Sequence, residues 1–276
     1  MVKVGLVGVG NCASSLVQGA HEQVRFTAAF DVDPGKVGRD LSEAIWAAPN
    51  NARRFADVPH LGVTVSGPSG ALEGTDVLVN FLPTGNQEAA EHYAAMALEA
   101  GCAFVNCMPA VLARSPEWAR RFADAGVPLI GDDLKSQFGS TLVHRALVDA
   151  LSRNGVKLTN SYQLNNGGNM DFLALQDPAA LKSKQATKAQ GAGISAHVGA
   201  AYVPWLEDRK VAYIRLEGEG FGGTAVEVEV RMSVEDSPSA AGNVLAAIEQ
   251  AKRALDAGIG GVVPSALMKS DQQPAL

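Results

Sequence analysis

Residues 2–20 read VKVGLVGVGNCASSLVQGA, and this stretch decides the fold class. It begins as an apolar β-type run, passes through Gly8-x-Gly10-x-x-Ala13, and ends in a helix of small residues. In a dinucleotide fingerprint, the first glycine makes the tight turn and the second lets the backbone approach a pyrophosphate. The small third residue allows close packing of helix on strand. The stretch therefore predicts a strand–turn–helix unit that binds a dinucleotide.

A second apolar run, VRFTAAFDVD (24–33), places Asp31 about 20 residues beyond the glycines, as this unit requires. An acid there hydrogen-bonds the adenosine ribose hydroxyls and repels a 2′-phosphate, so the sequence predicts NAD rather than NADP. Asn11 and Cys12 lie within the glycine turn and join the candidate cofactor contacts. The alternative is a glycine-rich turn in some other α/β unit.

Apolar, β-rich runs continue to alternate with helical stretches up to residue 133. The runs are VTVSGP (63–68), DVLVNFLPTG (76–85), CAFVNCMPA (102–110) and VPLIGDD (127–133), and the later helical stretches are NQEAAEHYAAMALEAG (86–101) and SPEWARRFADAG (115–126). Such alternation indicates a parallel sheet covered by helices on both faces. The sequence therefore predicts an α/β domain of the Rossmann type.

Ligands of such sheets bind beyond the carboxyl ends of the strands. This rule places three turns along one rim: Pro83, Thr84 and Gly85; Cys107, Met108 and Pro109; and Asp132 with Asp133. The first turn is a candidate cofactor contact, and so is Asp133. Cys107 resembles a dehydrogenase nucleophile, but no histidine is near it in sequence, which favours a packing role.

The stretch GDDLKSQFGS (131–140) places two acids, a lysine and a serine between a predicted strand and a predicted helix. One interpretation is a helix cap, because Asp and Ser accept hydrogen bonds from first-turn amides. The other is an anion-binding site, because a helix N-terminus presents N–H groups and the positive end of a dipole.

After residue 155 the pattern changes to longer, partly alternating strands: KLTNSYQLNNGGNMDF (157–172), RKVAYIRLEGEGFG (209–222) and AVEVEVRMSVED (225–236). These predict an α+β segment appended to the first domain. A last helical stretch, SAAGNVLAAIEQAKRALDAG (239–258), is expected to pack back on the first domain. The predicted domains are 1–140 with 240–276, and 141–239.

The bulk composition excludes several classes of protein. The chain has 276 residues, 47% of them hydrophobic, and a net charge of −6, whereas a nucleic-acid surface should be basic. No apolar run is long enough for a membrane span or a signal peptide. We expect a cytoplasmic protein with no nucleic-acid or membrane partner. The three cysteines form no CxxC pair that would indicate zinc.

Several motifs together resemble one family. They are VGVGNCASSLVQG, AAFDVDPGKVG, GDDLKSQFGST, QLNNGGNMDFL, LEDRKVAYIRLEG, VEDSPSAAG and GIGGVVPSALMKS. From residue 2 to about 270 the chain is similar to bacterial and archaeal myo-inositol-1-phosphate (inositol-3-phosphate) synthases. The resemblance implies a two-domain architecture like that of glyceraldehyde-3-phosphate dehydrogenase. It also implies a homotetramer, with a dimer as the alternative, that converts glucose 6-phosphate to inositol 3-phosphate using a recycled NAD.

The implied reaction calls for fixed positive charge. Closing a six-carbon chain needs a ketone at C5, an enolate at C6 and an aldehyde at C1, and the oxyanions formed must be stabilised. Lysine supplies a compact point charge whose pKa shifts on burial. The resemblance assigns four lysines to the active site: Lys184, Lys188, Lys210 and Lys269. A solvated surface charge is the alternative for any one of them.

The resemblance also places one acid of GDDLKSQFGS beside the reacting carbons. We assign Asp132 to proton transfer, with Asp133 as the alternative. Ser136, Gln137 and Gly139, at the start of the following helix, are expected to bind the substrate phosphate. The cap and the anion site are then the same structure.

A second polar cluster follows a predicted strand end in NNGGNMDF. The resemblance favours sugar-hydroxyl contacts or organisation of the nicotinamide by Asn165, Asn169 and Asp171. The alternative is a glycine turn with Asx hydrogen bonds. Asp236 opens the last helix; it is expected near the cofactor by resemblance and as a helix cap by position, and the two roles are compatible. The sequence has no recognisable cation motif and leaves a metal or ammonium requirement undetermined.

The chain departs from the family by being shorter. The link from the first predicted helix to the second predicted strand, GAHEQVRF (19–26), is shorter than in the family. The stretches after Asn51 and after Lys188 are also shorter, and the chain stops soon after Lys269. Three hypotheses follow: the isomerase itself, a related NAD-dependent enzyme that acts on another sugar phosphate or stops at the keto stage, and a non-catalytic NAD-binding protein.

Overall fold

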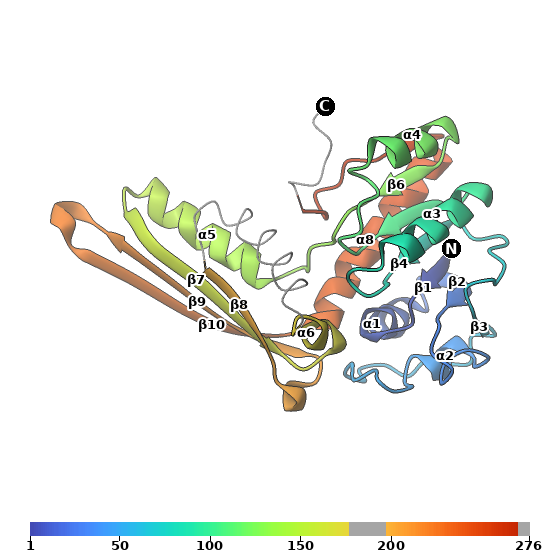
Figure 1. The fold of residues 1–276 in the computed structure, drawn as a ribbon, viewed down its shortest axis with the longest axis horizontal. Helices are drawn as coiled ribbons and strands as arrows, with labels where there is room; N and C mark the ends of the chain where they lie inside the picture. The colour runs from blue at the N-terminus through green and yellow to red at the C-terminus, as the bar shows by residue number, and fades with distance from the viewer. Residues whose placement is uncertain (177–196, 270–276) are drawn as a thin grey trace. The chain divides into compact units, whose positions relative to one another are not determined.

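The computed structural model describes residues 1–176 and 197–269, which form two compact units (Figure 1). Unit 1 comprises Met1–Ser136 and Ala240–Leu276, and unit 2 comprises Gln137–Ser239. The sequence prediction placed the first boundary at residue 140 instead.

Unit 1 is built on a seven-stranded sheet whose order is β11-β6-β5-β4-β1-β2-β3. Its strands are β1 (Val2–Val7), β2 (Val24–Phe30), β3 (Val65–Ser66), β4 (Val77–Asn80), β5 (Ala103–Asn106), β6 (Pro128–Ile130) and β11 (Gly261–Val262). Every neighbouring pair is parallel. The strand order reverses between β1 and β4, and this is the switch point at which such sheets bind dinucleotides. The predicted Rossmann-type fold is confirmed.

Helices cover both faces of this sheet, because its central strands are apolar on both sides. The helices are α1 (Asn11–Ala20), α2 (Leu41–Ala44), α3 (Gln87–Glu99), α4 (Pro116–Asp124) and α8 (Asp236–Asp256). One core cluster joins α1, α2 and α8 to the sheet, and the other joins α3 and α4. Ala241, Val244 and Ile248 of α8 lie in the first cluster, as predicted for the last helix.

Unit 2 contains a four-stranded mixed sheet in the order β10-β9-β7-β8. Its strands are β7 (Lys157–Gly167), β8 (His197–Tyr202), β9 (Arg209–Glu219) and β10 (Ala225–Glu235). The helical elements among its described residues are α5 (Ser140–Arg153), α6 (Met170–Ala174), η1 (Pro204–Leu206) and η2 (Phe221–Gly223). The β9–β10 and β7–β9 pairs are antiparallel and the β7–β8 pair is parallel. Helix α5 packs along one face, where Val148 meets Ile214 and Leu216 (Figure 1).

Across the described residues, no helix has both the length and the hydropathy of a bilayer span.

Candidate active site

The glycine turn after β1 has the geometry that a dinucleotide requires. Gly8 has φ +87°, and a Cβ there would approach the carbonyl oxygen of Phe81 to 2.9 Å, so a larger residue does not fit. A Cβ on Gly10 would meet no protein atom within 4 Å. Gly10 precedes α1 and has no side chain to cap it. The turn therefore leaves open space beside a helix N-terminus, where a pyrophosphate is stabilised.

Asp31, at the end of β2, braces this turn. One carboxylate oxygen accepts a hydrogen bond from the Val9 amide at 2.7 Å, and the other accepts from the amides of Val32 and Asp33. A carboxylate oxygen has two lone pairs, so the oxygen bound to Val9 retains acceptor capacity for a ribose hydroxyl. The residues present therefore fit the adenosine half of NAD.

Two residues that sequence reasoning missed complete the brace. Lys36 is buried, with its Nζ 3.9 Å from the Asp31 carboxylate and 3.1 Å from Asn50 Oδ1. Asn50 Nδ2 in turn donates to the Val9 carbonyl at 2.9 Å. The backbone of Val9 is thus held through both its amide and its carbonyl group. In the sequence, Lys36 could have been identified as the lysine that follows Asp31 in DVDPGK, whereas no motif pointed to Asn50.

Asn11, the first residue of α1, holds the segment that follows α2. Its Oδ1 accepts hydrogen bonds from the amides of Asn51 and Ala52, and its Nδ2 donates to Asn51 Oδ1 at 2.6 Å. Cys12 follows it and is partly exposed. The Asn11 side chain therefore organises the wall of the turn, which leaves direct cofactor contact by this side chain a prediction.

Asp132 is completely buried, and all its contacts are with donors. Its Oδ1 accepts from Asn106 Nδ2 at 2.7 Å and the Ala113 amide at 3.0 Å. Its Oδ2 accepts from the Leu112 and Arg114 amides, with Arg114 Nε 3.6 Å away. Burial raises the pKa of Asp132, and these hydrogen bonds oppose that rise. With its lone pairs occupied and its surface exposure 0%, this carboxylate does not fit the predicted proton transfer.

Asp133, the alternative acid, lies in a different environment. It is partly exposed, adopts φ +62°, and its carboxylate forms an ion pair with Lys269 Nζ. Residues 133–135 run antiparallel to the C-terminal segment, with Leu134 bridged to Met268 and the Lys269 amide donating to the Asp133 carbonyl. This pairing explains how residues 136 positions apart meet. A left-handed conformation at a non-glycine residue costs energy and is typical of functional sites.

Cys107 has the character of a core residue. It is buried in the cluster that joins α1, α2 and α8 to the sheet. Burial raises the pKa of its thiol well above the usual range, and the nearby Cys12 and Asp133 raise it further. A thiol held protonated is a poor nucleophile, so the geometry favours the packing role.

Unit 2 gathers five polar residues where β7 ends, β9 begins and α8 begins. Lys210 Nζ forms an ion pair with Asp236. Asn169 Nδ2 bridges the carboxylates of Asp208 and Asp236, at 3.2 and 3.3 Å. Asp208 also accepts hydrogen bonds from Ser237 Oγ and from the Ser237 amide. Of the predicted residues, the structure therefore brings Lys210, Asn169 and Asp236 together, and Asp171 is near enough for its charge to act on Lys210.

The charge on Lys210 follows from these neighbours. Burial lowers the pKa of the ammonium, but the charge and hydrogen bond of Asp236, with the charges of Asp171 and Asp208, outweigh it and raise the pKa above the usual value. Lys210 is therefore a fixed cation at neutral pH. Asp208 was missed from sequence, although it stands two residues before Lys210 in LEDRKVAYI.

Asn165 does not join this cluster. It is 1% exposed, and its Oδ1 accepts hydrogen bonds from Ser140 Oγ at 2.9 Å and Gln163 Nε2 at 3.0 Å, while its Nδ2 donates to the Gly199 carbonyl. These contacts connect α5 to β7. The predicted sugar contact is therefore not supported for Asn165, because successive strand residues face opposite sides and Asn165 faces α5.

The remaining predicted residues fall in three places. Gly139 is the N-cap of α5 and forms no side-chain cap; Ser136 is partly buried and Gln137 is exposed. Pro83, Thr84 and Gly85 form the turn after β4, where Gly85 has φ +99°. Lys184 and Lys188 lie outside the described residues.

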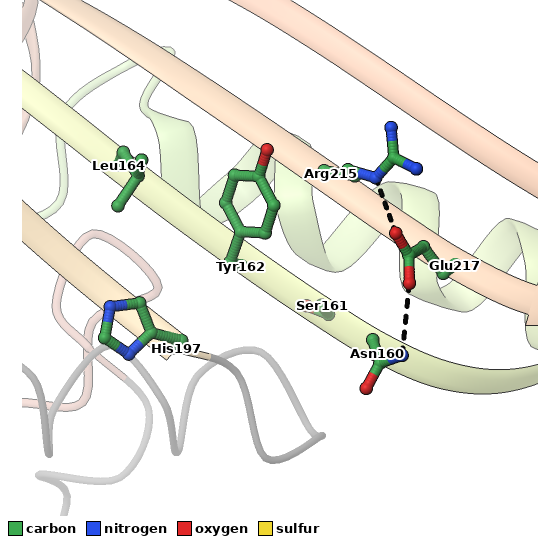
Figure 2. A pocket seen from close by; sticks show the side chains of 7 residues that line it. All are labelled: Asn160, Ser161, Tyr162, Leu164, His197, Arg215 and Glu217. Carbon is green, nitrogen blue, oxygen red and sulfur yellow. Dashed lines mark hydrogen bonds and ion pairs between the residues drawn. The ribbon is translucent and has the colours of Figure 1, made fainter.

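A pocket of about 720 Å³ lies on the sheet of unit 2. Figure 2 shows the side chains that line it, from β7, β8 and β9: Asn160, Ser161, Tyr162, Leu164, His197, Arg215 and Glu217. None of them belongs to the predicted site. Among the described residues that line the pocket, Arg215 is matched by Glu217, Glu227 and Glu229, so its cation is not left unpaired for a phosphate.

Within residues 1–176 and 197–269, no group of three or more His, Cys, Asp and Glu side chains is arranged to hold a metal ion.

Comparison with known proteins gives one consistent family. The sequence profile described as myo-inositol-1-phosphate synthase matches residues 139–237. The inositol-3-phosphate synthase of Mycolicibacterium smegmatis is 42% identical, and the match covers 98% of this chain and 93% of that protein. The inositol-3-phosphate synthase of Corynebacterium glutamicum is 39% identical over 98% of this chain and 93% of that protein.

The match with the M. smegmatis protein extends over 338 residues against 276 in this whole chain, so at least 62 positions have no counterpart here. Among solved structures, the crystal structure of Ari2 superposes with a TM-score of 0.84 at 36% identity, covering 95% of this chain and 89% of that one. A myo-inositol-1-phosphate synthase-related protein from Thermotoga maritima gives a TM-score of 0.75 at 23% identity, over 95% of this chain and 90% of that one, which is a likeness of fold.

Proposed function

This chain belongs to the myo-inositol-1-phosphate synthase family, and from that premise we propose that it cyclises D-glucose 6-phosphate to 1D-myo-inositol 3-phosphate. The observation that carries the proposal is the ion pairing of two predicted catalytic lysines. Lys210 and Lys269 each form an ion pair with a carboxylate, and neither is a freely solvated surface charge.

The bound NAD would supply the redox chemistry, accepting a hydride from C5 and returning it after ring closure. The chain's own residues then have three tasks: to orient the cofactor, to move protons, and to stabilise negative oxygens. Asp31, Gly8 and Gly10 serve the first task, because they shape the turn at the N-terminus of α1.

Lys210 serves the third task. Because its pKa is raised, it remains an ammonium at neutral pH and can stabilise an alkoxide or enolate oxygen without first gaining a proton. Asp133 replaces Asp132 as our candidate for proton transfer, because its carboxylate is partly exposed and paired with Lys269. The roles assigned to Lys184 and Lys188, and phosphate binding by Ser136, Gln137 and Gly139, stay predictions.

Replacing Asp31 with alanine should weaken NAD binding about 10- to 100-fold, the cost of removing a charged hydrogen-bond acceptor. The substitution removes both the acceptor for ribose and the acceptor for the Val9 amide. Calorimetric titration with NAD measures the effect. Asp57→Ala is the matched control, because Asp57 is an exposed acid of the same unit. Equal NAD affinity in both variants would remove Asp31 from the cofactor site.

The proposed activity is tested by incubating the protein with D-glucose 6-phosphate and catalytic NAD, while inositol phosphate and NADH are followed together. A recycled hydride predicts inositol phosphate without accumulation of NADH. Stoichiometric NADH would mean that the reaction stops at the keto stage. NAD binding without turnover of any hexose phosphate would favour the non-catalytic protein.

One observation favours a second candidate, a related enzyme for another sugar phosphate. At least 62 positions of a 42% identical relative are missing here, and missing loops change the walls of a substrate pocket more readily than its catalytic groups. A panel of hexose 6-phosphates in the same assay separates the candidates. Turnover of another hexose 6-phosphate, without turnover of glucose 6-phosphate, would favour the related enzyme.

We further propose that the protein is a homotetramer, with a dimer as the alternative, and that the sheet face opposite α5 contributes to the contact. Leu164 and Tyr213 are register partners on this face and are 39% and 41% exposed. Tyr213→Asp should lower the assembly mass seen by light scattering after gel filtration, because the interface would bury a charge. Leu173→Asp, equally exposed on α6, is the control. An unchanged mass for Tyr213→Asp would place the contact elsewhere.

A further inference from the structure

Three buried polar side chains form a ladder across the carboxyl ends of adjacent strands in unit 1. Asn80 ends β4, Asn106 ends β5, and Asp132 follows β6; each is 0% exposed. Asn80 Nδ2 donates to Asn106 Oδ1 at 2.9 Å, and Asn106 Nδ2 donates to Asp132 Oδ1 at 2.7 Å. The ladder thus crosses three neighbouring strands directly beneath the rim.

Each member of the ladder also holds a rim loop. Asn80 Oδ1 accepts from the Leu82 amide at 3.0 Å, next to the turn at residues 83–85. Asn106 accepts from the Met108 amide at 3.3 Å and donates to the Ala110 carbonyl at 2.7 Å. Asp132 accepts from the three amides of residues 112–114. One polar chain therefore ties together the loops of three strands.

The ladder has a direction, and Asp132 sets it. An ionised carboxylate only accepts hydrogen bonds, so Asn106 must present its NH2 group to Asp132 and its oxygen to Asn80. Asn80 must then present its own NH2 group to Asn106, which leaves its oxygen for the Leu82 amide. A carboxylate at one end therefore fixes the orientation of both amides.

The ladder leads to the ion pair of Asp133 and Lys269. Asp133 follows Asp132 in the chain, and its amide donates to the Met108 carbonyl at 3.0 Å, within the loop that Asn106 holds. The next amide, that of Leu134, donates to the Cys107 carbonyl of the same loop. The backbone of Asp133 is therefore fixed by the ladder on one side and by the ion pair with Lys269 on the other.

We propose that Asn80, Asn106 and Asp132 form a positioning relay that holds Asp133 against Lys269, and that Asp132 is a positioning residue rather than a catalytic one. The role of Asp133 and Lys269 in turnover rests on the proposed function. Burying a charge and two amides costs free energy that an apolar core would not, which accords with a device that specifies geometry.

The test is Asp132→Asn, which preserves shape but places an NH2 donor among the amides of residues 112–114. We expect kcat to fall on the order of 100-fold, the effect of misplacing a catalytic group by about 1 Å. KM should stay within about twofold, and the NAD dissociation constant should change much less than kcat, because the contact of Asp31 with the glycine turn is untouched. Asp57→Asn is the control, since Asp57 is an exposed acid.

Crystal structures of the parent protein and Asp132→Asn give a readout that does not depend on turnover. The relay predicts that the Asp133–Lys269 ion pair is displaced or broken in the variant. An intact ion pair would overturn the relay, whether or not the parent cyclises any sugar phosphate. A loss of thermal stability with unchanged kcat would also overturn it. If Asp132→Asn does not fold, Asn80→Leu at the far end of the ladder is expected to lower kcat less, and the same structural criterion applies.

Discussion

Replacing Lys210 with methionine should lower kcat by about 10²- to 10³-fold and leave NAD affinity within about twofold. Methionine retains most of the apolar volume and removes the cation that Asp236, Asp171 and Asp208 keep protonated. Steady-state kinetics and NAD titration give the two numbers. Lys157→Met is the matched control, because Lys157 is an exposed lysine of the same sheet, paired only with exposed Glu219 among the ion pairs of the described residues.

Loss of the cation leaves the carboxylates of Asp236 and Asp208 close together, so Lys210→Met should also be less stable. The double variant Lys210→Met with Asp236→Asn separates the two effects, since it should regain thermal stability without regaining kcat. Recovery of activity in the double variant would show that Lys210 serves only to neutralise Asp236.

The pH dependence distinguishes a fixed cation from a base. A lysine with a raised folded pKa contributes stability that is present below its usual value of 10.5 and is lost as pH rises through the folded pKa. Deprotonation of Lys210 should therefore cause no fall in kcat between pH 7 and 9. A change in kcat near pH 8 that the parent protein shows and the Lys210→Arg variant lacks would contradict this assignment.

The sequence predicted most of the fold because local patterns and global topology agree in this chain, although it did not predict strands β8 and β11. Each apolar run bounded by turn residues became a strand of the parallel sheet, and the glycine fingerprint stands at the reversal of strand order. The same patterning predicted that the last helix returns to unit 1, where Val244 and Ile248 are fully buried.

The site was harder to predict where neighbouring residues share one chemistry. Asp132 and Asp133 are equivalent in sequence, and only the left-handed backbone at Asp133 and the antiparallel contact with the C-terminal segment separate their environments. Asn165 and Asn169 differ likewise, because the first faces α5 from a strand and the second caps α6. Such differences depend on tertiary contacts, which local pattern does not specify.

The residues missed altogether, Asp208, Lys36 and Asn50, act through other side chains. Lys36 and Asn50 hold Val9 and Asp31, and Asp208 contacts Asn169 and the start of α8. Motif reasoning identifies groups that touch ligand. It has no comparable signal for a buried side chain whose partner is another part of the fold.

The second large effect is expected at the other ion pair. Asp133→Asn should lower kcat by about 10²- to 10⁴-fold, the usual range for a group that transfers a proton. Lys269→Met should give a loss of similar size, because the lysine forms an ion pair with this carboxylate and holds it in place. NAD affinity is measured for both variants as well, because Asp133 is also a predicted cofactor contact and lies with Cys12 of the glycine turn near Cys107.

A double-mutant cycle decides whether the two residues act as a unit. If they do, Asp133→Asn with Lys269→Met should lose little more activity than either single variant, as groups that share one step are strongly non-additive. The surface ion pair of Lys252 and Asp256 in α8, whose acid is exposed, is the matched control, and its cycle should leave kcat unchanged. Additive losses at Asp133 and Lys269 would mean that the ion pair is structural. The proton would then have to be moved by another group, and the relay beneath Asp133 would position a contact that turnover does not use.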